Sequence, residues 1–321
     1  VSQVAAVVIG RNEGDRLVAC LKSFRDQVSR VVYVDSGSTD GSPEAARDLG
    51  AEVVALDLAT PFTAARARNA GLDALAGDPP EFVQLVDGDC TLQPGWIETA
   101  LGFLEVHPEV AIACGRRREI HPEHSVFNRL CDDEWNTPVG EALACGGDAL
   151  ARWEAVDAAG GYNATLIAGE EPDLCVRLRA AGWKIWRLDA DMTAHDADIR
   201  RLGQWWKRSS RAGHAFAEGA HLHGAEHGHW VSETRRLLIW GLGIPLVTLV
   251  AVLLFGGWGL LLLALYPVQI ARLARARGIG DRFSWERAFF LTLGKIPEAL
   301  GALRFYRARL TSRQSELIEY K

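Results

Sequence analysis

Short apolar runs alternate with helical stripes over the first 195 residues of the chain. Each apolar run is rich in β-branched residues and is bounded by glycine or a polar turn, which is typical of a buried strand. Strands are expected at residues 4–9, 31–34, 52–56, 82–86, 110–114 and 183–188, and helices at 17–24, from 42, and at 64–76, 96–107, 149–159 and 174–181. This alternation indicates βαβ units and a mostly parallel sheet. Residues 121–141 are irregular and suit a loop over a site.

The pattern changes near residue 199. Residues 199–216 form a basic-aromatic helix, which we assign to a first domain of residues 1–218. Histidine and glycine then dominate residues 219–229, which predicts a linker. Residues 237–266 contain no charged side chain, and this run is longer than the ~20 residues that a membrane span needs. We therefore predict an all-α, membrane-associated region over residues 219–321.

Arginines flank the uncharged run on both sides. They are Arg235, Arg236, Arg272, Arg275 and Arg277. Because positive charge gathers on the cytoplasmic side, a hairpin over about residues 236–271, turning at Gly256-Gly257, is favoured. A single span, which would place one cluster on the wrong side, is the alternative. Further on, apolar and basic residues at helical spacing predict an interfacial amphipathic helix over about residues 284–310, kinked at Pro297.

Composition narrows the class of protein. The net charge of −6 gives no electrostatic case for nucleic acid as a partner. The six cysteines are scattered without paired spacing, which indicates reduced thiols in a cytosolic compartment. The first apolar run is too short for a signal peptide, so we expect the first domain on the cytoplasmic side.

Two carboxylates end the apolar run at residues 82–86. Asp87 and Asp89 flank Gly88, and open α/β sheets bind ligands at the carboxyl ends of their strands. Oxygen ligands on a glycine-permitted turn suit a hard divalent cation that holds a phosphate-bearing substrate. Taken alone, an Asp-Gly-Asp turn is an ordinary acidic strand end, so its interpretation depends on the motifs around it.

Five motifs occur along the chain in a fixed order. They are Val7-Val8-Ile9-Gly10-Arg11-Asn12-Glu13, Val34-Asp35-Ser36-Gly37-Ser38-Thr39-Asp40-Gly41, Ala67-Arg68-Asn69-Ala70-Gly71, Asp87-Gly88-Asp89 and Gly169-Glu170-Glu171-Pro172-Asp173-Leu174. This ordered set resembles the family 2 glycosyltransferases over about residues 4–195. The resemblance implies the α/β GT-A fold, a mostly parallel mixed sheet flanked by helices. It also implies inverting transfer of a sugar from a nucleotide-diphospho-sugar of UDP or GDP type.

The resemblance implies which residues hold the donor. Asp35 matches the residue that contacts the base or ribose, and Asp87 the one that contacts the sugar or ribose. Arg68 matches a residue that reaches the diphosphate or braces the site, whereas Arg66 lies on another face of the same helix. The remaining donor-side residues of the matching motifs, including a glycine element, are Ile9, Arg11, Asn12, Glu13, Gly88, Gly146 and Gly147.

The resemblance also implies a cation and a general base. Asp89 and His195 match the metal ligands, for Mn²⁺ or Mg²⁺. Glu171 matches the base that takes the proton from the acceptor hydroxyl, and repulsion from its neighbour Glu170 can raise its pKa. Because Glu171 stands where aspartate is commoner, Glu170 stays open as the base.

The tail indicates the acceptor. A membrane-bound catalytic domain suits a polyprenyl-linked sugar in bacterial surface polysaccharide or glycolipid synthesis, at the cytoplasmic face of the inner membrane. Trp205 and Trp206 are expected at the membrane surface. Acceptor-side candidates are Asp173, Trp205, Trp206, Arg208 and Arg211. The alternatives are a transferase acting on a non-lipid acceptor and an inactive membrane-bound scaffold that binds nucleotide-sugar.

Overall fold

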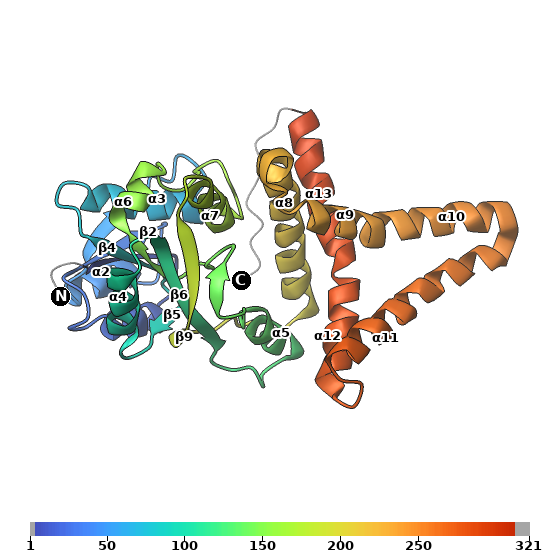
Figure 1. Cartoon of the computed structure of the whole chain (residues 1–321), viewed down its shortest axis with the longest axis horizontal. Coiled ribbons are helices and arrows are strands. Elements are labelled where there is room, and N and C mark those ends of the chain that lie inside the picture. The colour runs from blue at the N-terminus through green and yellow to red at the C-terminus, as the bar shows by residue number, and fades with distance from the viewer. Residues whose placement is uncertain (1–3, 312–321) are drawn as a thin grey trace. The chain divides into compact units, whose positions relative to one another are not determined.

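A computed structural model describes residues 4–311 of the chain, which forms two compact units. Figure 1 follows the chain from the first unit, Val1–Asp198, into the second, Ile199–Lys321. The first unit contains every strand of the described residues, and the second is helical.

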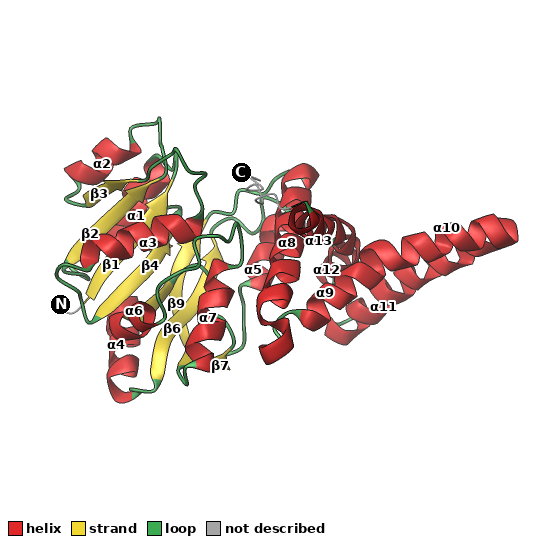
Figure 2. Ribbon diagram, turned by 90° about the horizontal axis from the view of Figure 1, so that it is seen from above, coloured by secondary structure: helices red, strands yellow, loops and turns green. Residues whose placement is uncertain are grey.

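One mixed sheet is the core of the first unit, and Figure 2 shows its strands in yellow between red helices. Its strands are β1 (Val4–Gly10), β2 (Arg30–Asp35), β3 (Glu52–Ala55), β4 (Phe82–Asp87), β5 (Cys90–Leu92), β6 (Val110–Glu119), β7 (Gly140–Ala142), β8 (Ala149–Arg152) and β9 (Lys184–His195). Hydrogen-bonded neighbours follow the order β3-β2-β1-β4-β8-β6-β9-β5, with β7 beside β9. Strands β1 to β4 are parallel, whereas β8 runs antiparallel to β4 and β6.

Helices bury the sheet on both faces. They are α1 (Asp15–Ser23), α2 (Ser42–Asp48), α3 (Ala64–Leu75), α4 (Trp96–Val106), α5 (Val126–Glu134), α6 (Trp153–Ala158) and α7 (Glu170–Ala180). Residues 4–9 of β1 are all buried, as expected of a strand covered on both sides. Thr63 caps α3 by accepting a hydrogen bond from the Arg66 N–H at 3.2 Å. A Cβ at Gly71 would collide with Val7, so this glycine lets α3 lie close to β1.

Three local predictions in this unit are wrong. The expected helix at 149–159 begins as β8, because residues 149–151 are buried in the middle of the sheet and burial outweighs the helix propensity of alanine. The strand expected to end at 188 continues to His195, where β9 pairs with β5 and β6. The expected loop at 121–141 contains α5, which Ser125 caps by accepting a bond from Asn128 N–H at 2.9 Å.

The boundary between the units differs from the predicted one at residue 218. Helix α8 (Leu202–His227) runs through that position without a break, and the residues expected to form a linker are mostly helical. The glycines there serve packing, since a Cβ at Gly219 would lie 2.5 Å from the ring of Trp230 and one at Gly224 would lie 2.9 Å from Val231. Small residues therefore let α8 approach the chain that follows it.

The uncharged run folds back on itself within the second unit. It lies within a series of helical elements, which are α9 (Val231–Leu238), the π-helical turn η1 (Ile239–Gly243), α10 (Ile244–Phe255), the 3-10 segment η2 (Gly256–Ala264) and α11 (Leu265–Arg277). The chain leaves along α10 and returns through α11 (Figure 1), and the Tyr266 hydroxyl donates to the Trp240 carbonyl at 2.6 Å. By length and composition, Val231–Arg277 is apolar enough to cross a membrane. Leu253, Phe255 and Trp258 are among its most exposed side chains.

The expected amphipathic helix at 284–310 is two helices, α12 (Arg282–Leu293) and α13 (Lys295–Leu310). The helix is interrupted at Gly294, three residues before the expected kink at Pro297. Proline has no N–H to donate to the carbonyl of Leu293, one turn earlier, so the helix breaks at that earlier turn. The expectation of a surface position is wrong for Trp205, which is 7% exposed and packs edge-on against Phe290 with ring centroids 5.2 Å apart.

Candidate active site

The carboxyl ends of β1, β2 and β4 bring two of the predicted aspartates to one edge of the sheet. Ile9 is in register with Asp87, and Gly10 is in register with Asp35. The Gly88 N–H donates to the Ile9 carbonyl at 2.8 Å, so the turn that follows β4 is hydrogen-bonded to the end of β1. The three strands are buried as parallel neighbours, so the polar residues that end them lie at the same edge of the sheet.

Arg68 joins the two acidic motifs of the predicted site. Its guanidinium donates to Asp87 Oδ1 at 2.7 Å and to Glu170 Oε1 at 2.7 Å, and also to the Gly147 carbonyl at 3.3 Å. The side chain is 3% exposed and lies 5.4 Å from the ring centroid of Tyr162. The resemblance implies that Arg68 either reaches the diphosphate or braces the site, and these contacts with two carboxylates favour the bracing role.

A second arginine, which the sequence analysis did not single out, holds the other side of Asp87. Arg117 Nη2 lies 3.4 Å from Asp87 Oδ2, and the same guanidinium forms a fork with the carboxylate of Asp148 at 2.7 and 3.0 Å. Asp148, which is fully buried, also accepts from the Asp87 N–H at 3.1 Å and from the Thr193 hydroxyl at 2.7 Å. Burial opposes ionisation of Asp87, yet Arg68 and Arg117 outweigh it and lower its pKa.

Gly147 lies against this charged network and leaves no room for a side chain. A Cβ there would be 2.9 Å from Asp87 Oδ2 and 3.0 Å from Arg117 Nη2. We expect Gly147→Ala to lower the free energy of unfolding by about 1–3 kcal/mol, because the added methyl group overpacks fixed side chains. Thermal or urea unfolding measures the loss.

Gly102→Ala is the matched control for that substitution. Gly102 lies within α4, and a Cβ there would meet nothing within 4 Å. The stability of this variant should equal or slightly exceed that of the wild type, since alanine favours helices. An unchanged stability in both variants would contradict the close packing around Gly147.

Asp89 and His195, the expected metal ligands, lie next to each other. Asp89 Oδ2 lies 3.2 Å from His195 Nε2, and both side chains are 8% exposed. Among the described residues, His195 Nδ1 is buried without a hydrogen-bond partner. Cys90 completes a group of three possible ligands, and the ring of Trp135 packs edge-on against the imidazole at 4.8 Å. A carboxylate and an imidazole with an unused nitrogen fit a divalent cation.

The two loops after β1 and β2 are tied together at the same edge. Asn12 accepts from the Thr39 N–H at 2.7 Å through Oδ1 and donates its own N–H to Ser38 Oγ at 2.9 Å. The Asp35 carboxylate accepts from Tyr33 Oη and from the N–H groups of Gly37 and Ser38, each at 3.0 Å. These bonds hold the carboxylate of Asp35 in a turn at the place predicted for the base or ribose.

The other two residues of the first motif face different partners. The Arg11 guanidinium lies 4.9 Å from the ring centroid of Phe62, and Glu13 pairs with Arg16 at 2.8 Å. Arg11 thus contacts an aromatic ring, and Glu13 forms an ion pair with a residue of α1.

The two candidate bases have opposite surroundings. Glu170 pairs with the permanently charged Arg68, whereas Glu171 Oε1 accepts from the Cys145 N–H at 2.6 Å and from two thiols, Cys145 Sγ at 3.1 Å and Cys175 Sγ at 3.0 Å. Burial raises the pKa of the Glu171 carboxyl, and the hydrogen bonds offset part of that rise. A buried carboxylate among neutral donors is suited to accept a proton.

The acceptor-side candidates are divided between the two units. Asp173 pairs with Arg177 one turn along α7 at 2.8 Å, and Arg177 also donates to the Gly161 carbonyl at 2.8 Å. Trp205, Trp206, Arg208 and Arg211 lie on α8 in the second unit. Asp173 therefore stabilises the start of α7 within the first unit.

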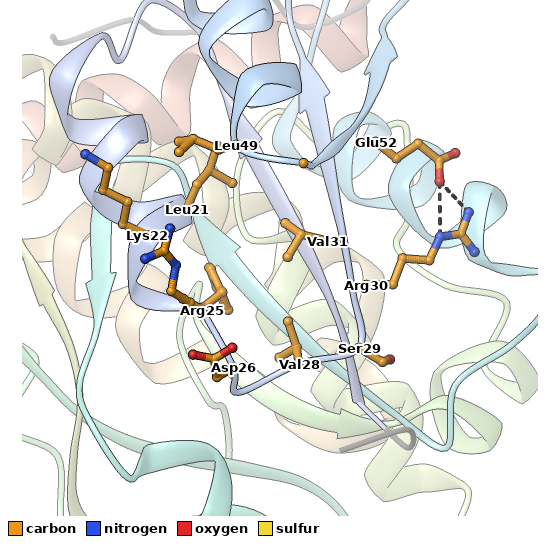
Figure 3. A pocket seen from close by; sticks show the side chains of 12 residues that line it. Leu21, Lys22, Arg25, Asp26, Val28, Ser29, Arg30, Val31, Leu49 and Glu52 are labelled. Atoms are coloured by element: carbon orange, nitrogen blue, oxygen red, sulfur yellow. Dashed lines mark hydrogen bonds and ion pairs between the residues drawn. The ribbon is translucent and has the colours of Figure 1, made fainter.

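A pocket of about 300 Å³ lies at the opposite end of the strands (Figure 3). Its walls include Arg30 and Glu52, the first residues of β2 and β3, which form an ion pair. Because ligands of such sheets bind beyond the carboxyl ends of the strands, this pocket is separate from the candidate active site.

The mixed sheet and the helices that flank it form the GT-A fold. A solved structure with this architecture, the mannosyltransferase PcManGT from Pyrobaculum calidifontis in complex with GDP-Man and Mn²⁺, superimposes with a TM-score of 0.65 at 20% identity. The match covers 94% of this chain and 87% of that one, so it extends into the helical second unit. The predicted fold is confirmed.

Part of the first unit also matches a family model. Residues 6–140 match the model described as Glycosyl transferase family 2. The pre-mycofactocin glycosyltransferase of Mycobacterium tuberculosis is 29% identical over 74% of this chain and 52% of its own length. The succinoglycan biosynthesis protein ExoA of Rhizobium meliloti is 26% identical over 61% of this chain and 64% of its own length. The chain thus spans about half the length of the mycobacterial relative.

Proposed function

We propose that the protein is a metal-dependent inverting glycosyltransferase that moves a sugar from a nucleotide-diphospho-sugar to an acceptor hydroxyl. The observation that carries this proposal is the network that places Asp87, Arg68 and the Glu170-Glu171 pair at one edge of the sheet. Residues that are far apart in the sequence and match the motifs of the domain meet there. Relatives named as glycosyltransferases support the same conclusion.

The donor binds along the ends of β1, β2 and β4 in this proposal. Asp35 and the Asn12 loop take the base and ribose, and Asp87 takes the sugar or ribose. Arg68 acts through Asp87 and Glu170, because both of its ends are already paired with carboxylates. The nucleotide is of GDP or UDP type, and GDP-Man in the mannosyltransferase structure supports the first.

Asp89 and His195 would hold the divalent cation. When bound, the cation neutralises charge on the departing diphosphate, which is the main electrostatic demand of glycosyl transfer. Imidazole is a better ligand for Mn²⁺ than for Mg²⁺, and Mn²⁺ accompanies the donor in the mannosyltransferase structure.

Glu171 takes the proton of the acceptor hydroxyl as its oxygen attacks the sugar carbon. The bond from that carbon to the diphosphate breaks on the opposite side, so the configuration inverts. Glu170 is less suited as the base, because its pair with Arg68 at 2.7 Å uses the carboxylate for structure. The raised pKa of the buried Glu171 carboxyl supports an enzyme over an inactive scaffold.

The second unit attaches the enzyme to a membrane in this proposal. Its apolar hairpin exposes large side chains to an extent that is costly in water, such as Trp258 at 77% and Leu253 at 76%. Arginines at both ends of the hairpin favour the cytoplasmic face of a bacterial inner membrane. A polyprenyl-linked sugar is the acceptor that suits this location.

A donor screen tests the proposed function. The purified protein with Mn²⁺ is offered UDP-, GDP- and dTDP-sugars in a thermal-shift assay, and the stabilising donor is then assayed in radiolabelled form with extracted lipid acceptors. We expect a rise in melting temperature for one nucleotide class and label in the lipid fraction, both lost in Asp89→Asn. Donor binding without any turnover would support the scaffold, and label only in soluble acceptors would contradict the lipid-linked substrate.

A further inference from the structure

Two thiols and a carboxylate form a compact cluster next to the network around Asp87. Cys145 Sγ and Cys175 Sγ are 3.8 Å apart, and each lies within 3.1 Å of Glu171 Oε1. Glu171 and Cys175 are one turn apart on α7, so they project from the same face of that helix. Cys145 comes from the loop between β7 and β8 and is half-buried, while the other two are buried.

The spacing of the two sulfur atoms matches that of a thiolate metal site. With metal–sulfur bonds of about 2.3 Å, two ligands of a tetrahedral Zn²⁺ ion are about 3.8 Å apart. The observed separation of the two sulfur atoms is 3.8 Å without a disulfide between them. A carboxylate oxygen and a sulfur on the same ion would be about 3.5 Å apart, so Glu171 would have to move by only about 0.5 Å from its observed hydrogen bonds.

The surroundings of the cluster also suit a metal site. The Cys145 N–H donates to Glu171 Oε1 at 2.6 Å, which is the kind of bond that orients a metal-binding carboxylate. The half-buried Cys145 gives access from solvent. Three protein ligands leave a fourth tetrahedral position for water, as in open zinc sites.

We propose that Cys145, Cys175 and Glu171 form a binding site for a thiophilic divalent cation of the Zn²⁺ type. Binding forms two metal–sulfur bonds and one metal–oxygen bond and releases both thiol protons to solvent. The site is distinct from Asp89 and His195, which offer the harder oxygen and nitrogen donors that suit Mn²⁺. In this proposal the chain holds two cation sites, of which the thiolate site offers the softer ligands.

The consequence for transfer rests on the proposed function. A cation on Glu171 occupies the carboxylate that would accept the proton of the acceptor, so Zn²⁺ inhibits the reaction that Mn²⁺ supports. Inhibition should be reversed when a chelator removes Zn²⁺ and Mn²⁺ is then restored in excess.

Titration of the reduced full-length protein with Co²⁺ tests the site without any assay of transfer. Co²⁺ bound to thiolates gives intense charge-transfer absorption that carboxylate and imidazole ligands do not give. We expect this band to saturate at one Co²⁺ per chain and to disappear when Zn²⁺ is added. It should fall by at least half in Cys145→Ser and in Cys175→Ser, which each keep one thiolate, and it should be unchanged in Asp89→Asn.

Cys90→Ser is the matched control, because Cys90 is a buried thiol beside the other candidate metal site. The band should persist in this variant. In the wild type, Zn²⁺ should also slow the alkylation of Cys145, as mapped by mass spectrometry, which needs no substitution. Absence of the band from the wild type, an undiminished band in Cys175→Ser, or loss of the band in Cys90→Ser alone would overturn the proposal. None of these outcomes depends on whether sugar is transferred.

Discussion

Glu171→Gln is expected to lower the transfer rate by about 10²–10⁴-fold, the usual contribution of a general base, while donor binding stays unchanged. Glutamine keeps the shape of the side chain and can still accept from the Cys145 N–H. It cannot take a proton from the acceptor. The measurement is kcat with saturating acceptor, alongside the melting temperature with and without donor. A variant that transfers sugar at the wild-type rate would exclude Glu171 as the base.

The dependence on pH gives an independent check of the same residue. An ordinary glutamate has a pKa of about 4.3. Because burial raises the pKa of Glu171, its basic form is lost at a higher pH than that of an ordinary glutamate. The acid limb of the rate profile should shift upward accordingly. The raised pKa also affects the stability of the fold, and it favours the folded state at low pH. A raised folded pKa stabilises the fold below the unfolded pKa, and this contribution is lost as pH rises through the folded pKa. Glu171→Gln should therefore be at least as stable as the wild type near pH 7.

Arg68→Met is expected to cause the largest loss of stability. Asp87 and Glu170 would each lose a partner at 2.7 Å, and removing one member of a buried ion pair costs about 3–5 kcal/mol. For a domain of this size, the melting temperature should fall by roughly 10 °C. The melting temperature of Arg68→Lys should fall between those of the wild type and Arg68→Met, since an ammonium group keeps the charge but cannot span both carboxylates in the same way.

Arg66→Met is the control on the same helix. Its guanidinium donates to backbone carbonyls, those of Asp57 at 3.0 Å and of Thr60 and Pro61 at 2.7 Å, and pairs with no carboxylate in the contacts described. Its loss should cost about 1 kcal/mol or somewhat more. Equal melting temperatures for the two methionine variants would contradict the bracing role of Arg68.

The parts of the site that follow from strand ends could be predicted from the sequence. Apolar runs locate β1, β2 and β4, and parallel pairing brings Asp35 and Asp87 to the same edge. The meeting of Asp89 with His195 was predicted from motif resemblance alone, because the expected strand stopped short of His195.

The parts that depend on contacts between distant segments could not be predicted in this way. Arg68 and Glu170 are 102 positions apart, and no periodicity connects them. Arg117 lies within a run of three arginines that are alike in sequence, and only the fold shows which one reaches Asp148. The position of Trp205 was misjudged because an aromatic residue in a basic helix has the same pattern whether it packs on a neighbouring helix or faces a membrane.

Glycine contacts within the second unit have a consequence for how that unit can be handled. A Cβ at Gly213 or Gly301 would collide with the backbone of the facing helix, at Glu298 and Ser210 respectively, and one at Gly241 would collide with Lys295. Helices α8 and α13 are thus held by direct backbone contact, which does not weaken when apolar solvent replaces water as the hydrophobic effect does. These helices should therefore stay paired in detergent micelles, and larger residues at Gly213 or Gly301 should separate them there as readily as in buffer.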